Sequence, residues 1–319
     1  MSARGTEAVG VSIVVPVYRS EGTLRPLFER LTKTLHGTPG GFEVVFVDDA
    51  SPDGSWRVLE ELQRTHPERI VAVRLARNFG QHNALMCGFR EARGAVVVTM
   101  DDDLQNPPEE VPKLLSALAD PEQDVVYGRF HTKKHRPWRN GGSWLINVFY
   151  RRVFGSDVTV SSFRAIRKAT VENILTYDLN FTFIDGLIAW NTQRIAEVDV
   201  LHHARPGGRS GYTLARLATL AFNLFTNFSL LPLQFVSAMG LALAGAGFLV
   251  GGWYLVAFVR HKIGVPGYAS TITAILVLGG AQLVALGIIG EYLGRLHLNV
   301  NRKPQYAVRK RLSSPDRQG

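Results

Sequence analysis

The stretch "VVVTMDDDLQNPPEE", Val96 to Glu110, runs from β-prone apolar residues directly into three aspartates, Asp101 to Asp103. Mutual repulsion disfavours ionising three neighbouring carboxyl groups unless a cation lies between them. Apolar residues followed by turn-forming residues and prolines are typical of a buried strand that ends at this point. The stretch therefore predicts a strand end that carries a metal site.

Three further apolar, β-branched runs precede it: residues 11–18 ("VSIVVPVY"), 42–51 ("FEVVFVDDAS") and 70–78 ("IVAVRLARN"). The segments between the runs have helical periodicity, for example at Leu24, Leu27, Phe28, Leu31 and Leu35, and again at Trp56, Leu59 and Leu62. Continuous apolar strands that alternate with helices predict a parallel sheet covered on both faces. The fold class is α/β, of the nucleotide-binding type.

Polar residues follow each of the four runs. Tyr18 follows the first, Asp48 and Asp49 end the second, Asn78 ends the third and the aspartates follow the fourth. Ligands of open α/β sheets bind beyond the carboxyl ends of the strands, so we expect these side chains to meet at one site. The sequence has neither GxGxxG nor GxxxxGK[ST], which argues against a dinucleotide fold or a P-loop.

The last third of the chain is apolar. No charged side chain occurs in residues 217–259 or 263–290, although 20% of the chain is charged. Each stretch exceeds the roughly 20 apolar residues that span a bilayer. We predict one spanning helix over residues 233–259 and a second over residues 270–293. The segment before them, residues 212–232, has the pattern of an amphipathic helix at the headgroups.

Basic residues favour a cytoplasmic location for the bulk of the chain. The first ten residues do not resemble a secretory signal, and the C-terminal residues 295–319 are rich in Arg and Lys. Two spans place both termini on the same side, which the positive-inside rule makes cytoplasmic. We therefore expect a multi-pass protein of the inner (plasma) membrane with four parts: a catalytic domain (1–211), an interfacial region (212–232), a hairpin (233–294) and a basic tail (295–319).

A net charge of +9 is compatible with nucleic acid or with an anionic bilayer as partner. The basic clusters lie close to the apolar stretches, and we find no nucleic-acid-binding motif, so we expect the bilayer and no nucleic acid.

Four stretches in order, "SIVVPVYRSEGTLRPL", "VVFVDDASPDGS", "LARNFGQHNALMCGF" and "VTMDDDLQNPPEEVPKL", resemble the family 2 glycosyltransferases of the GT-A fold. The resemblance is to the polyprenyl-phosphate branch, which includes dolichol-phosphate mannose synthases, bactoprenol glucosyltransferases and aminoarabinose transferases. "SSFRAIRK", "FIDGLIAW" and "GIIGEYLGRLHLNVNRKPQY" extend it into the apolar part.

The resemblance implies a nucleotide-sugar donor and a divalent metal, Mg²⁺ or Mn²⁺. Asp101 and Asp103 match the DXD pair of the family, and Gln105 matches a further metal or diphosphate position. Asp102 lies on the opposite side of the strand end and is assigned to the donor rather than to the metal. The residues that match the nucleoside positions are Pro16, Tyr18, Val47 and Asp49. Relatives often have Glu two residues beyond the tyrosine, where this chain has Ser20 and then Glu21.

The acceptor of this branch is a lipid phosphate, which is already an anion and needs no strong general base. Arg129, Arg139 and Ser143 match acceptor-phosphate positions, and Arg205 matches a contact to the donor diphosphate. The lysine expected six residues later is Gly211, so Arg209 is a candidate replacement. We give structural roles to the adjacent histidines at 202 and 203 and to Asp185.

The sequence thus predicts inverting sugar transfer from a nucleotide sugar, preferably a UDP-sugar, to polyprenyl (undecaprenyl) phosphate at the cytoplasmic face. The alternatives are a processive polysaccharide synthase, which typically carries QxxRW and more spans, and a non-catalytic scaffold or translocator. Neither QxxRW nor further apolar spans occur here. Whether the protein forms homo-oligomers, and which sugar it transfers, stays open.

Overall fold

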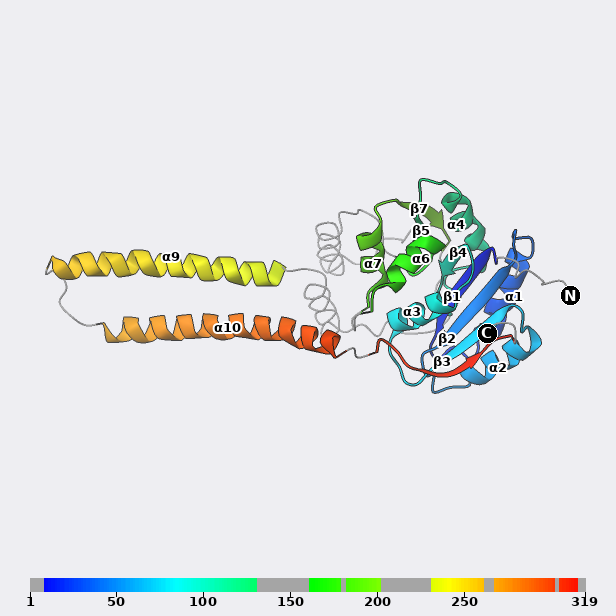
Figure 1. Ribbon diagram of the computed structural model, residues 1–319, viewed down its shortest axis with the longest axis horizontal. Helices are drawn as coiled ribbons and strands as arrows, with labels where there is room; N and C mark the ends of the chain where they lie inside the picture. Colours follow the sequence, from blue (N-terminus) through cyan, green and yellow to red (C-terminus); the bar gives the residue numbers. More distant parts are fainter. Residues whose placement is uncertain are drawn as a thin grey trace. The chain divides into compact units, whose positions relative to one another are not determined.

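The computed structural model describes residues 9–130, 161–178, 182–201, 231–260, 267–301 and 304–314. The chain divides into two units (Figure 1). Unit 1 comprises residues 1–210 and 304–319, and unit 2 comprises residues 211–303.

Unit 1 contains a mixed sheet whose described strands have the order β7-β5-β6-β4-β1-β2-β3-β8. The four apolar runs form its parallel centre: β1 (Val11–Val17), β2 (Phe42–Asp48), β3 (Ile70–Leu75) and β4 (Val96–Thr99). The predicted α/β class is confirmed.

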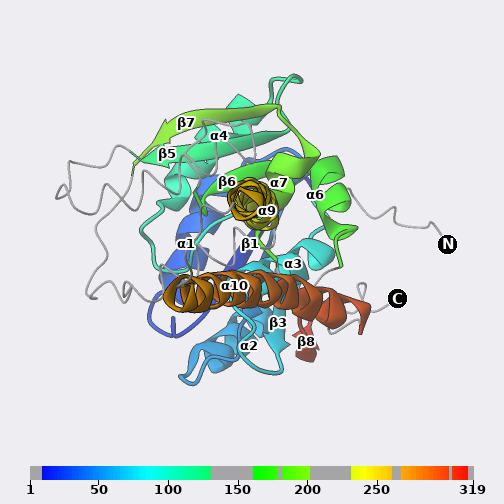
Figure 2. The same cartoon turned by 90° about the vertical axis from the view of Figure 1, so that its left-hand side faces the viewer.

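The outer strands extend the sheet on both sides. β6 (Arg164–Arg167) runs antiparallel to both β4 and β5 (Val125–Phe130), and β7 (Ile195–Val200) is parallel to β5. β5 and β7 therefore run in the same direction as the central strands. On the other side, β8 (Val308–Leu312) pairs antiparallel with β3 (Figure 2).

Helices cover both faces of the sheet. The first face carries α1 (Leu24–Leu35), α2 (Ser55–Thr65), the short 3-10 turn η1 (Pro108–Glu110) and α4 (Val111–Leu118). The second carries α3 (Gln81–Glu91), together with α6 (Lys168–Leu175) and α7 (Ile184–Asn191). Alternate strand residues supply the two faces because successive side chains of a strand point in opposite directions. The five periodic apolar residues predicted for the first helix are the residues that α1 buries.

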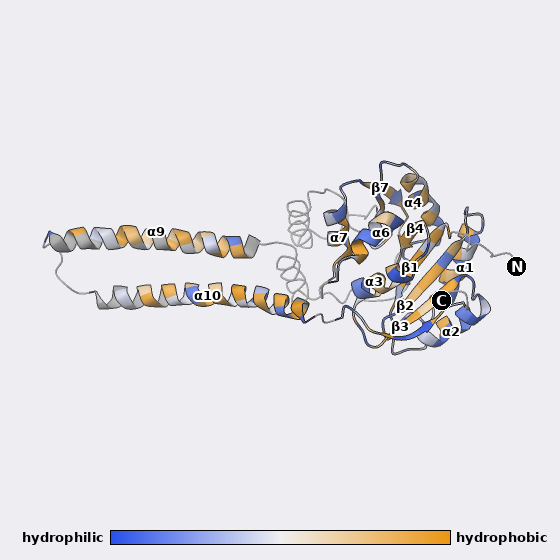
Figure 3. Ribbon diagram, viewed as in Figure 1, coloured by the Kyte–Doolittle hydropathy of each residue, from blue (hydrophilic) through white to orange (hydrophobic). Residues whose placement is uncertain are grey.

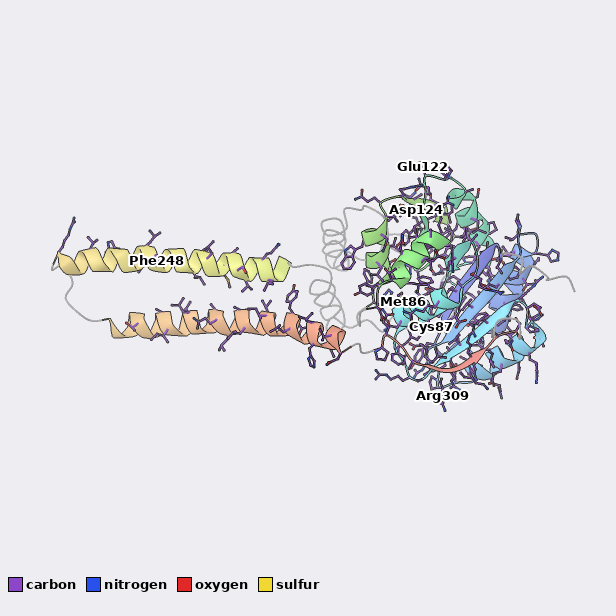
Figure 4. The ribbon with its side chains drawn as sticks, in the orientation of Figure 1. Met86, Cys87, Glu122, Asp124, Phe248 and Arg309 are labelled. Atoms are coloured by element: carbon purple, nitrogen blue, oxygen red, sulfur yellow. The ribbon has the colours of Figure 1, made fainter. Side chains whose placement is uncertain are left out.

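Unit 2 contains two long helices, α9 (Leu231–Val259) and α10 (Tyr268–Val300). Both are long and apolar enough to cross a membrane, over Leu233–Trp253 and Val277–Leu298, and almost none of the described residues in these windows is buried. Figure 3 shows apolar residues along both helices, and Phe248, labelled in Figure 4, is 85% exposed. Exposed apolar surface of this extent is typical of a segment that contacts a membrane or another protein.

The C-terminal segment differs from the sequence expectation. α10 continues to Val300, beyond the predicted end near residue 293, and residues 304–314 belong to unit 1, where β8 lies. The segment expected as a basic tail thus contributes an edge strand to the sheet of unit 1.

A close approach of α3 to the sheet gives a test of this packing. A Cβ added at Gly88 would lie 2.3 Å from Val14 Cγ1 and 3.3 Å from Val47 Cγ2, and both valines are fully buried. Because valine is stiff at χ1, neither neighbour yields easily. We expect Gly88→Ala to lower the free energy of unfolding by about 1 to 2 kcal/mol, overpacking exceeding the gain in helix propensity. Thermal unfolding of the full chain in detergent measures it.

The matched control is Gly37→Ala, because a Cβ at Gly37 meets no atom within 4 Å and its backbone does not have positive φ. Equal melting temperatures for the two variants would contradict the packing of α3 described here.

Candidate active site

A cavity of about 340 Å³ lies at the carboxyl ends of the central strands. It brings together the strand-end residues that the sequence predicted to meet, except Asp48, which is fully buried and does not line it. Its lining residues are Pro16, Val17, Tyr18, Asp49, Asn78, Gly80, Gln81, Asp101, Asp102 and Asp103.

Asp101 is fixed by two donors from different parts of the sheet. Gln81 Nε2 donates to Oδ1 at 2.8 Å, and Ser162 Oγ donates to Oδ2 at 2.6 Å. Gln81 is the first residue of α3 and Ser162 precedes β6, so the side chain has a defined orientation. A carboxylate has about four lone-pair positions, so Asp101 retains acceptor capacity toward the cavity.

Asp102 turns toward the end of β1. It accepts hydrogen bonds from the backbone N–H of Tyr18, at 3.1 Å, and from Ser20 Oγ. Asp103 Oδ1 accepts from the backbone N–H of Gln105 at 3.1 Å. Gln105 itself is not among the residues that line the cavity.

Burial of these carboxyl groups disfavours their charged forms. Burial raises the pKa of Asp101, and the like charge of Asp103 raises it further. Burial also raises the pKa of Asp102 to about 6, although the bonds from Ser20 and Tyr18 act in the opposite direction. A cation at this position would remove the repulsion, which is the situation the three consecutive aspartates predicted.

The donor set of the cavity fits a hard divalent cation. Within the part of the chain that the structure describes, no cluster of three or more His, Cys, Asp or Glu side chains has metal-binding geometry. Mg²⁺ is usually held by one or two carboxylates and completes its shell with water and substrate phosphate oxygens. Asp101 and Asp103 satisfy this pattern, since both line the cavity.

Three of the four residues predicted to hold the nucleoside line the cavity, and the fourth does not. Pro16, Tyr18 and Asp49 line the cavity, and Tyr18 is 44% exposed. Both oxygens of Asp49 accept backbone hydrogen bonds, from Phe79 at 2.6 Å and from Gly80 at 2.8 Å. Asp49 therefore shapes the loop after β3 as well as the cavity. Val47 is fully buried and packs behind the cavity without lining it.

Three backbone positions around the cavity have positive φ without being glycine: Arg19 (59°), Ala50 (56°) and Leu104 (60°). Each directly follows a lining residue, namely Tyr18, Asp49 and Asp103. Such conformations cost free energy and persist where the surrounding structure determines them, commonly at functional sites. The three loops are thus held in defined shapes by their neighbours.

Beneath the acidic strand end lies a buried polar network that sequence reasoning did not identify. Arg164, 1% exposed, pairs with Asp185, and Tyr127 Oη donates to the same carboxylate at 2.9 Å. Arg164 Nε also lies 3.2 Å from Thr99 Oγ1 at the end of β4. Asp185 thus contacts Arg164 and Tyr127, and it does not line the cavity. Sequence motifs that contain Arg164 and Asp185 were recognised, but the ion pair between the two side chains could not be predicted from them.

The remaining predicted residues lie elsewhere. Arg129 is on β5, where its guanidinium contacts Asp199 at 2.7 Å and Glu197 at 3.3 Å; it does not line the cavity. Glu21 accepts from the N–H of Gly54 at 3.0 Å and pairs with Arg57, a structural role at the start of α2. The other predicted positions fall outside the described residues: Arg139, Ser143, Arg205, Arg209, Gly211 and the histidines at 202 and 203.

His82 is a neutral histidine beside the cavity. Its Nδ1 accepts from the N–H of Ile184 at 3.4 Å, and its ring contacts Phe183 edge to face. Burial, with a smaller effect of the Arg164 charge, lowers the pKa of His82 to about 4 from its ordinary 6.5.

Between pH 6.5 and 4 the unfolded chain binds a proton at this histidine that the folded chain does not. Its contribution to stability is present above pH 6.5 and is lost as the pH falls, by up to about 3 kcal/mol. We expect His82→Gln to reduce the drop in melting temperature between pH 7 and pH 4.5. Thermal unfolding at both pH values checks this, and an identical drop in the variant and the unaltered protein would contradict it.

Comparisons with known proteins agree with this geometry. Residues 12–184 match the family description "Glycosyl transferase family 2", and residues 218–296 match "GtrB C-terminal hairpin". The chain is a family 2 glycosyltransferase. The resemblance seen in the motifs of this family 2 enzyme is confirmed, and it extends through both apolar helices.

Curated relatives match over nearly the whole enzyme. The undecaprenyl-phosphate 4-deoxy-4-formamido-L-arabinose transferase of Proteus mirabilis is 36% identical over 306 residues, covering 94% of this chain and 93% of the relative. The protein of that name from Pseudomonas savastanoi pv. phaseolicola is 36% identical over 308 residues, covering 94% and 90%. Together with the two apolar helices, these relatives identify the enzyme as a membrane-associated protein.

Solved structures support the GT-A fold. Glucosyl-3-phosphoglycerate synthase of Mycobacterium tuberculosis in complex with phosphoglyceric acid has a TM-score of 0.50 at 17% identity, covering 69% of this chain and 80% of that one. The same enzyme with Mn²⁺, UDP and phosphoglyceric acid has a TM-score of 0.50 at 16% identity, covering 68% and 76%. At this identity the likeness concerns the fold.

Proposed function

We propose that the enzyme transfers a sugar from a uridine diphosphate donor to undecaprenyl phosphate or a similar polyprenyl phosphate, with inversion at the anomeric carbon. The observation that carries the proposal is the match to undecaprenyl-phosphate sugar transferases along more than nine-tenths of the chain, hairpin included. The sugar named for those relatives, 4-deoxy-4-formamido-L-arabinose, is the first one to test.

The cavity suits the donor end of this reaction. Pro16, Tyr18 and Asp49 form the side that would receive the nucleoside, and Asp101 to Asp103 form the side that would face the diphosphate. Asp101 and Asp103 would hold a divalent cation, Mg²⁺ or Mn²⁺, with Gln105 as a further candidate ligand. When bound, such an ion neutralises the charge that develops on the leaving diphosphate. A structural neighbour of the same fold contains Mn²⁺ and UDP.

The acceptor end requires positioning rather than a strong base. An oxygen of the lipid phosphate attacks the anomeric carbon, the bond from that carbon to the diphosphate oxygen breaks, and the nucleoside diphosphate leaves with the electron pair. Attack from the face opposite the leaving group inverts the configuration. A dianionic phosphate is already a nucleophile, so guanidinium and hydroxyl groups that orient it are sufficient.

Two outer strands have an end at the edge of the sheet that contains the cavity. β7 runs in the same direction as the central strands, so its end at Val200 lies at the carboxyl edge of the sheet, and the chain continues from there to α9. β8 is antiparallel, so it begins at the same edge, where Val308 pairs with Leu75. Within unit 1, the end of β7 and the start of β8 therefore lie at the same edge of the sheet as the cavity.

Arg129 is the described candidate for the acceptor phosphate, with Arg139, Ser143 and, toward the donor diphosphate, Arg205 as further candidates. Arg129 pairs in register with Asp199 near the end of β5, so it lies at the same edge of the sheet as the cavity. Its two carboxylate partners raise the pKa of Arg129, which keeps it cationic. Binding of a lipid phosphate would require Arg129 to exchange these partners.

The proposal includes a cytoplasmic catalytic unit and cytoplasmic termini in the inner membrane, based on the basic residues around the hairpin. A processive synthase is less well supported, because QxxRW and additional spans are lacking in the sequence. A non-catalytic scaffold would not need the complete set of acidic strand ends.

The decisive experiment incubates membranes that contain the enzyme with undecaprenyl phosphate and a panel of labelled UDP- and GDP-sugars, followed by lipid extraction. Label in the lipid fraction that depends on both substrates supports the proposal. Label that enters a long polysaccharide, or no transfer from any donor, would overturn it.

Divalent metal should be obligatory for transfer. Asp103→Asn removes one of the two proposed carboxylate ligands, and we expect a loss of at least 100-fold in kcat, which corresponds to several kcal/mol of transition-state stabilisation. The measurement is the transfer rate at saturating substrates, with and without excess chelator. The control is Asp178→Asn, whose side chain is 78% exposed and lies outside the cavity. Full activity in chelator would refute metal dependence.

Arg129 should act on the acceptor rather than the donor. We expect Arg129→Ala to raise the apparent KM for undecaprenyl phosphate about 10-fold or more, because a charge-assisted contact is lost, while nucleotide affinity stays the same. Arg194→Ala is a suitable control, because this exposed arginine pairs with Asp124 away from the cavity. If nucleotide affinity falls instead, Arg129 belongs to the donor end.

A further inference from the structure

The loop after β2 forms part of the cavity wall and is held from below by one arginine. Asp49 lines the cavity, and Ala50 beside it has positive φ. Asp48, whose side chain is fully buried, accepts from the N–H of Ser51 at 3.0 Å and so closes the loop. Arg74 on β3 places its Nε 3.2 Å from Asp48 Oδ2, an ion pair without hydrogen-bond geometry, and donates from Nη2 to the carbonyl of Ser51 at 3.4 Å.

The same loop supports the neighbouring loop after β1. The backbone N–H of Arg19 donates to Ser51 Oγ at 3.2 Å, and that of Ser20 donates to Ser55 Oγ at 2.9 Å. Ser20 in turn donates to Asp102. A displacement of the loop at residues 48–51 would therefore move Tyr18 and Asp102 as well as Asp49.

Arg74 is itself held by the C-terminal strand. In the register of β3 and β8, Arg74 is opposite Lys310, so both side chains lie on the face covered by α2. The Arg74 guanidinium is 5.6 Å from the centre of the Trp56 ring, and Lys310 Nζ is 5.9 Å from the same centre. Glu60 fixes this arrangement by accepting from Trp56 Nε1 at 2.8 Å and pairing with Lys310 at 2.7 Å.

Each of the two cations next to the Trp56 ring has a carboxylate partner. Glu60 lies beside Lys310, and Asp48 lies beside Arg74, so two cations can share one aromatic ring without net repulsion. Burial raises the pKa of Asp48, whereas the hydrogen bonds from Ser51 and, to a smaller extent, the Arg74 charge act in the opposite direction. Without β8 beside it, Arg74 would be more exposed to water, and its attraction to Asp48 would weaken.

We propose that Arg74 is a positioning residue of the donor site, which acts through Asp48 and Ser51 on the cavity wall, and that β8 holds Arg74 in place through Lys310 and Trp56. The inference rests on the proposed function, since it takes the cavity to be the nucleotide site. According to this inference, the C-terminal strand β8 raises the affinity of the site for the nucleotide donor. The enzyme binds its nucleotide tightly when β8 is docked on β3.

The test uses the full-length protein in lipid nanodiscs. UDP and GDP are first titrated, each with Mn²⁺, to find which the unaltered protein binds, and that nucleotide is then used for the variants. Arg74→Lys keeps the charge but loses the forked contact to both Asp48 and Ser51. Lys310→Met removes the charge of Lys310 and keeps a similar stem. Arg309→Met is the matched control, because Arg309 is an exposed cation on the same strand, next to Lys310 and at the register shift between β3 and β8 (Figure 4).

We expect nucleotide affinity to fall 5- to 20-fold in Arg74→Lys and 2- to 5-fold in Lys310→Met, with Arg309→Met within 1.5-fold of the unaltered protein. The KM for the nucleotide sugar should rise in parallel, while kcat at saturating donor and the KM for undecaprenyl phosphate stay within twofold. A purely structural role would instead lower kcat through loss of folded molecules and leave the donor KM unchanged.

Unchanged nucleotide affinity in both variants, or a loss of kcat without a rise in donor KM, would overturn the positioning role while leaving the proposed function intact. If Arg74→Lys fails to fold, the comparison of Lys310→Met with Arg309→Met decides. Binding of neither UDP nor GDP by the unaltered protein would overturn the proposed function, and this inference with it.

Discussion

The repulsion among three carboxylates at the end of β4 is the constraint on which the site depends. Asp101, Asp102 and Asp103 are partly buried at a cavity, and burial raises the pKa of the first two. Each carboxylate accepts a hydrogen bond from a different partner, so the three side chains point in different directions and are held away from solvent. An arrangement of this kind is costly in the absence of a cation. Its persistence in the fold is understandable if a cation and an anionic diphosphate share the cavity during the reaction.

The rest of unit 1 holds these groups in place. The parallel centre of the sheet brings the ends of β1, β2, β3 and β4 to one edge, and the antiparallel β6 adds Ser162 and Arg164 from a later part of the chain. The strained residues at 19, 50 and 104 show that the loops there have shapes that the chain would not adopt unaided. Rigid strands below and constrained loops above are what preorganised binding of a charged donor requires.

Much of this arrangement could be predicted from the sequence, because it depends on local patterns. The apolar runs of β1 to β4 and the helical spacing of Leu24, Leu27 and Leu31 are readable from neighbouring residues alone. β8 was not predicted, because "VRKRL" is mostly basic and exposed and has the composition of a solvated tail. Its pairing depends on contacts with Glu60 and Glu91, more than two hundred residues earlier.

The same limit applies to the candidate site. Asp101 and Asp103 are adjacent to a strand and were identifiable, whereas the pair between Arg164 and Asp185 and the carboxylate partners of Arg129 arise only when separate strands come together. Because β8 follows the hairpin in the sequence, a protein truncated near Gly211 would lack β8 as well as the hairpin. Such a cut would change the catalytic sheet itself as well as its membrane attachment.

In the proposed reaction, a lipid phosphate oxygen attacks the anomeric carbon and displaces an intact nucleoside diphosphate. This can be tested by identifying the nucleotide released when the enzyme consumes a labelled UDP-sugar in bilayers containing undecaprenyl phosphate, with mass analysis of the lipid product. We expect one UDP for each sugar transferred and a lipid that carries a single phosphate between sugar and polyprenol. Release of UMP, with a sugar joined to the lipid through two phosphates, would contradict it.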